Sequence, residues 1–113
     1  MITIQIGNDE RSLDEASPQW ITQEINGRRR DGLFVCVRVH INTADVQMTL
    51  STPGCSGAGG GRPPTKREAS ILDLWREANL NDGDFTAGNV VWFFRLSRGI
   101  AVRGREVNAT LAG

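Results

Sequence analysis

The run from Leu33 to Ile41 constrains the fold of this chain more than any other stretch, because its side chains alternate with a period of two. One set starts with Leu33, continues through valines and ends at Ile41; the other set includes Phe34, Cys36 and His40. Such alternation of β-branched residues predicts a strand with one face in the core. We expect the Leu33 set to pack inward and His40 to face solvent.

Two further strands are predicted around this run. Residues Ile2–Ile6 alternate apolar and polar side chains and end at Gly7, and the stretch from Asn8 to Glu15 that follows is polar. Turn-forming residues at 42–45 precede a second alternating run at 46–51. The strands at 33–41 and 46–51 therefore read as a hairpin.

Two helices are predicted from their N-terminal signals. Ser17 can cap a helix that has Pro18 in its first turn and ends near Arg30. Thr65 and Glu68 have the spacing of a capping box, in which each side chain accepts from the other residue's backbone N–H.

The apolar run at 90–96 is short, and its periodicity does not separate helix from strand. Thr86 as a cap and Gly99 as a terminator favour a helix, whereas the β-branched and aromatic composition favours a strand. Residues 100–113 are expected to form a weakly structured tail or an edge strand, with Ile100 to Val102 as its candidate.

The expected class is α+β, in a single domain covering residues 1–113. The order strand, helix, strand, strand, loop, helix, helix gives a small three-stranded sheet, or a four-stranded one if the tail adds a strand. The helices are expected mainly on one face. Residues 52–64, which include TPGCSGAGGGRPP, are expected to form a mobile loop.

Charge and cysteine content limit the classes of function. The 13 basic and 13 acidic residues balance, which makes dedicated nucleic-acid binding an unfavoured function. No apolar stretch suits a membrane span and no signal peptide is recognisable, so a cytoplasmic protein is expected. In that reducing compartment Cys36 and Cys55, which form no CxxC motif, are expected to remain thiols.

The glycine-rich loop joins a strand to a helix N-terminus, where backbone N–H groups can hold an anion. The sequence does not match a phosphate-binding loop, because Pro63 and Pro64 follow Arg62 and remove two amide donors. A flexible connector is the favoured interpretation. The anion-binding candidates of the alternative interpretation are Gly57, Gly59, Gly60, Gly61 and Arg62.

Catalytic and metal-binding patterns are weak. Cys55 precedes several basic residues and is a weak candidate for a reactive thiol, but glycine stands at position 61, where a phosphatase motif has arginine. Cys36 and His40 supply two ligands, whereas structural zinc takes four. We therefore predict no metal and no cofactor.

The favoured function is a non-catalytic binding or protein-interaction module. Arg28, Arg29 and Arg30 are candidates for contacting a partner, against the simpler interpretation of a solvated helix end. The aromatic run around Trp92 exceeds what one small core can bury, which predicts a homodimer or another protein partner. The alternative is a small ligand- or anion-binding protein, or a thiol enzyme, that uses the loop around Cys55 and Arg62.

Overall fold

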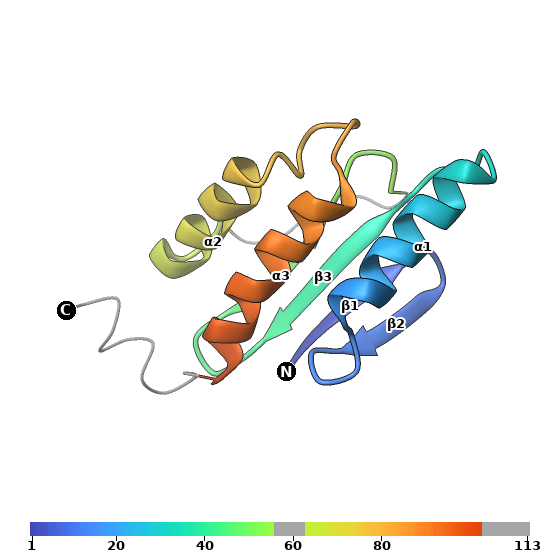
Figure 1. The fold of residues 1–113 in the computed structure, drawn as a ribbon. Helices are drawn as coiled ribbons and strands as arrows, with labels where there is room; N and C mark the ends of the chain where they lie inside the picture. The colour runs from blue at the N-terminus through green and yellow to red at the C-terminus, as the bar shows by residue number, and fades with distance from the viewer. Residues whose placement is uncertain (56–62, 103–113) are drawn as a thin grey trace.

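The computed structural model describes residues 1–55 and 63–102 and contains one sheet with helices on one side (Figure 1). The antiparallel strands have the order β2-β1-β3-β4. In chain order the elements are β1 (Ile2–Ile6), β2 (Asp9–Ser12), α1 (Pro18–Arg30), β3 (Val37–Asn42), β4 (Gln47–Ser51), α2 (Lys66–Glu77) and α3 (Ala87–Val102). The α+β class is thus confirmed.

The sheet has four strands, because the polar stretch after Gly7 forms β2, which the sequence pattern did not predict. This edge strand carries no apolar side chain toward the helices. Instead, the Asp9 carboxylate lies 3.3 Å from the Arg28 guanidinium, and the Arg11 guanidinium lies 4.5 Å from the ring centre of Trp20. Polar contacts with α1 therefore take the place of the hydrophobic alternation that predicts strands.

The core lies between one face of the sheet and the helices. The alternating residues of β1 and β3 on this face are all buried, namely Ile2, Ile4, Ile6, Val37, Val39 and Ile41. From α2 and α3, Trp75 and Phe93 meet edge to face, with ring centres 5.0 Å apart. The opposite face carries polar side chains such as Gln5 and His40, and the helices leave it uncovered (Figure 1).

The strand predicted from Leu33 begins later, at Val37. The Leu33 N–H donates to the Arg28 carbonyl at 2.9 Å, and Gly32 has φ +75°. Leu33 therefore still belongs to the turn that ends α1. As a result Leu33 is 55% exposed and Phe34 is 97% exposed. The prediction that Leu33 packs in the core is therefore wrong, whereas Val35 is buried as expected.

Residues 87–102 form α3, so the helical interpretation of the apolar run is confirmed. Ile100 to Val102 belong to this helix and form no strand. The side chains of Val90, Phe93 and Phe94 are buried, while Trp92 is 46% exposed. A helix this rich in apolar residues does not bury them all.

The predicted caps at Ser17, Thr65 and Thr86 are present, and the Thr86 hydroxyl accepts from the Asn89 N–H at 3.1 Å. The Ser17 hydroxyl accepts from the Trp20 N–H at 3.0 Å, and the Thr65 and Glu68 side chains complete the capping box of α2. The prediction that Gly99 ends the last helix is wrong, because α3 continues to Val102. Among the described parts of the predicted loop, Thr52 to Cys55 and residues 63–65 belong to neither a strand nor a helix. Residues 56–62 and 103–113 lie outside the described residues. No helix in the part of the chain that is described combines the length and apolarity needed to cross a membrane.

Candidate functional site

Cys36 and Cys55 are joined by a disulfide, with their Cα atoms 5.0 Å apart. The expectation of two free thiols is therefore wrong, and Cys55 is not a free nucleophile in this structure. The hairpin explains the proximity: Thr52 pairs with Val37, so the turn after Thr52 brings Cys55 back to the residue that precedes Val37. The sequence separation of 19 residues does not by itself predict that the two cysteines meet. The contact could have been predicted from the sequence only with the pairing register of the hairpin.

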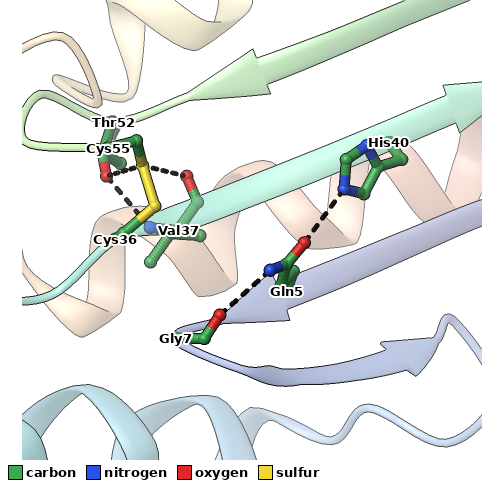
Figure 2. Close-up of a disulfide and its surroundings, with 7 residues drawn as sticks. All are labelled: Gln5, Gly7, Cys36, Val37, His40, Thr52 and Cys55. Carbon is green, nitrogen blue, oxygen red and sulfur yellow. Dashed lines mark hydrogen bonds between the residues drawn. A yellow bond between two sulfur atoms is a disulfide. The ribbon is translucent and has the colours of Figure 1, made fainter. Parts of the chain in front are cut away.

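The disulfide lies at the open end of the β3–β4 hairpin, where β3 begins and β4 ends (Figure 2). Beneath it, the Thr52 N–H donates to the Val37 carbonyl and the Val37 N–H donates to the Thr52 hydroxyl, both at 3.0 Å. The Cys55 sulfur lies 3.7 Å from the Thr52 Oγ1 and 3.8 Å from the Val37 carbonyl oxygen. Thr52 is buried, whereas both cysteines are half-buried.

His40 stands on the same sheet face as Cys36, as the alternation predicted. Its Nδ1 lies 3.0 Å from the Thr49 hydroxyl and its Nε2 lies 3.3 Å from the Gln5 Oε1. The Gln5 amide in turn donates to the Gly7 carbonyl at 3.0 Å (Figure 2). This network belongs to a solvated polar face, and within the described ranges no three metal-ligating side chains come together.

The Arg28–Arg30 cluster is divided among different roles. Arg28 lies 3.3 Å from both the Asp9 and the Glu24 carboxylates, which ties α1 to β2. The Arg29 guanidinium stacks 4.6 Å from the ring centre of Phe85. Of the three, Arg28 and Arg29 therefore have contacts within the fold, and Arg30 is exposed at the helix end.

Two pairs of large apolar side chains are exposed on the part of the surface that the structure describes. Trp92 and Leu96, one helical turn apart on α3, are 46% and 37% exposed. Leu33 and Phe34, between α1 and β3, are more exposed. The sequence pattern did not identify them as a surface pair, because its alternation placed both residues in a strand. Gly32 directly before them was the available signal, because a glycine after a helix commonly ends it in the left-handed conformation and delays the next element.

The remaining site candidates, Gly57, Gly59, Gly60, Gly61 and Arg62, lie outside the described residues. The loop hypothesis therefore stays a prediction. Comparison of the chain with protein-family models, curated proteins and solved structures finds no match.

Proposed function

We propose that this domain is a non-catalytic protein-interaction module whose main contact is the Leu33–Phe34 pair. The observation that carries the proposal is the 97% exposure of the Phe34 side chain. A fully buried phenylalanine or leucine side chain contributes about 1.5 to 3 kcal/mol relative to an exposed one. Binding of a partner that covers this pair would be stabilised by that hydrophobic free energy, because the isolated domain leaves both side chains exposed.

The segment that carries Phe34 is held in place on both sides. Leu33 is bonded to the end of α1, Val35 is buried, and the Cys36 carbonyl accepts from the Gly7 N–H at 3.0 Å. An aromatic side chain on a fixed backbone loses less conformational entropy on binding than one on a free loop. The geometry is therefore that of an anchor for a pocket on another protein.

Self-association is a second candidate, supported by the exposure of Trp92 and Leu96 on α3. A symmetric dimer that packs α3 against its copy would cover both side chains. Sedimentation of the wild type at micromolar concentration tests this proposal, and Trp92→Glu should leave a folded monomer. A monomeric wild type excludes the dimer.

Two finer proposals remain from the sequence. Ligand or thiol chemistry around Cys55 and Arg62 is the alternative function, and the thiol version requires that the disulfide first be reduced. We also propose a cytoplasmic location, where a disulfide is usually transient.

The interaction proposal is tested by placing a photoreactive phenylalanine analogue at position 34 and, as a control, at the exposed position of Gln23. In cells that express the protein, position 34 should give a discrete cross-linked product that position 23 does not. Excess unlabelled wild type should suppress this product, and the Phe34→Ser variant should not. Equal labelling at both positions, or equal competition by both proteins, contradicts the proposal.

A further inference from the structure

The Cys36–Cys55 disulfide joins the turn after β4 to the residue that precedes β3. We propose that it is a reversible redox switch: a dithiol reductant opens it, and opening frees the turn at residues 53–55 from β3 while the sheet stays folded. The inference goes beyond the proposed interaction and does not depend on it.

The disulfide lies outside the hydrophobic core. Cys36 continues the alternation that places His40 on the uncovered face of the sheet (Figure 2). The adjacent Val37 points the other way and is fully buried. Opening the S–S bond therefore leaves the apolar packing beneath the helices unchanged.

Next to the disulfide, hydrogen bonds between Thr52 and Val37 also hold the two strands of the hairpin together. Thr52 is 3% exposed and makes two hydrogen bonds with Val37, one through each N–H. From there β3 and β4 are paired as far as Asn42 and Gln47. These contacts need no sulfur, so the ladder should survive reduction.

The turn beyond Thr52 is held much more weakly. Pro53 has no backbone N–H, and Gly54 is exposed at φ +93°, with no described residue other than its chain neighbours within 4 Å of where a Cβ would be. The Cys55 N–H reaches the Thr52 carbonyl at 3.4 Å, which is long for a hydrogen bond. The disulfide is thus the strongest described link between this turn and β3.

Both cysteines are half-buried, and the switch requires that a reductant reach one of their sulfur atoms. A thiolate of the dithiol attacks one sulfur, forms a mixed disulfide and releases the other cysteine as a thiolate, which takes up a proton. The second thiol of the reductant then displaces the first cysteine. Overall, two electrons and two protons pass to the protein, and the dithiol becomes a disulfide.

The test equilibrates the full chain in mixtures of reduced and oxidised dithiothreitol and follows alkylation by mass spectrometry together with amide hydrogen exchange. Both thiols should appear in a single transition that reverses on reoxidation. Exchange at Cys55, whose N–H bonds to the Thr52 carbonyl, should accelerate by roughly tenfold or more, while exchange at Val39 and Leu50 stays slow.

The control is the double variant Cys36→Ser with Cys55→Ser, which should exchange like the reduced wild type in every redox mixture. Loss of protection at Val39 and Leu50 on reduction, or failure of the variant to fold, would show that the disulfide is a structural staple. Unchanged exchange at Cys55, or a transition that does not reverse, would also overturn the switch.

Discussion

The Glu68 Oε2 accepts a hydrogen bond from the Gln47 backbone N–H at 2.9 Å and thereby joins α2 to β4. The ladder explains why this N–H needs an acceptor. The Thr52 N–H donates to the Val37 carbonyl, and the Val46 carbonyl accepts from the Thr43 N–H. Because inward-facing and outward-facing residues alternate along an antiparallel ladder, the N–H of Gln47 points to the open edge. The same carboxylate accepts from the Thr65 N–H at 3.0 Å, so one buried side chain caps a helix and a strand edge.

Glu68→Ala should lower the free energy of unfolding by about 2 to 4 kcal/mol, because it removes the acceptor of two backbone N–H groups. Asp73→Ala on the same helix is the control. Asp73 is exposed and, among the described residues, pairs with Arg76 alone, at 3.3 Å, so its loss should change the unfolding free energy by about 0.5 kcal/mol or less. Urea denaturation measures both variants, and equal losses would contradict this role of Glu68.

A glycine series separates backbone strain from steric conflict. Gly32→Ala should cost about 1 kcal/mol, because Gly32 has φ +75° with open space around it. Gly7→Ala should cost more, because Gly7 has φ +61° and a Cβ would lie 2.5 Å from the Arg28 Nη1. That contact displaces the guanidinium from Asp9.

Gly83→Ala is the matched control, with open space and no positive φ. It should be neutral or slightly stabilising, by up to about 1 kcal/mol. Thermal unfolding ranks the three variants, and a Gly7→Ala protein as stable as the Gly83→Ala protein would disprove the strained contact.

The tryptophans on α2 and α3 should differ in energetic weight. Trp75 is 2% exposed and packs against Phe93, so Trp75→Ala should cost about 3 to 5 kcal/mol. Trp92→Ala should cost about 1 kcal/mol or less, because nearly half of this side chain is already in water. Denaturation followed by circular dichroism compares them, and a larger loss for Trp92 would place it in the core.

The Thr52 hydroxyl should stabilise the hairpin end by more than a surface hydroxyl does. Thr52→Val keeps the shape but removes the acceptor of the buried Val37 N–H, at an expected cost of about 1 to 2 kcal/mol. Thr49→Val on the exposed face should change stability by about 0.5 kcal/mol or less. Similar urea midpoints for the two variants would be the contrary result.

Much of the architecture could be predicted because its signals are local. The alternation in β1 and β3 identifies the core face, since successive strand side chains point to opposite sides. The capping residues Ser17 and Thr65 mark helix starts, because the hydrogen bonds they make lie within one turn. Local periodicity also placed His40 on the polar face.

The candidate contact at Phe34 could not be predicted in the same way. The alternation continued through Leu33, although the chain there is still bonded to Arg28 at the end of α1. A strand begins at the residue where a neighbouring strand is positioned to pair with it. Periodicity alone contains no information on that point.

The α+β class, the side of each strand that meets the core and the starts of α1 and α2 follow from the spacing of neighbouring residues. Three contacts arise only in the folded chain: Asp9–Ser12 pairs with β1, Cys36 meets Cys55 and Glu68 reaches Gln47. Each of these contacts joins segments that are brought together by the register of strands or the docking of a helix. Cys36 and Cys55 are 19 residues apart and Gln47 and Glu68 are 21 apart, so no local pattern specifies these two contacts. The β1–β2 pairing is local, but β2 has no alternation of apolar residues that would predict a strand.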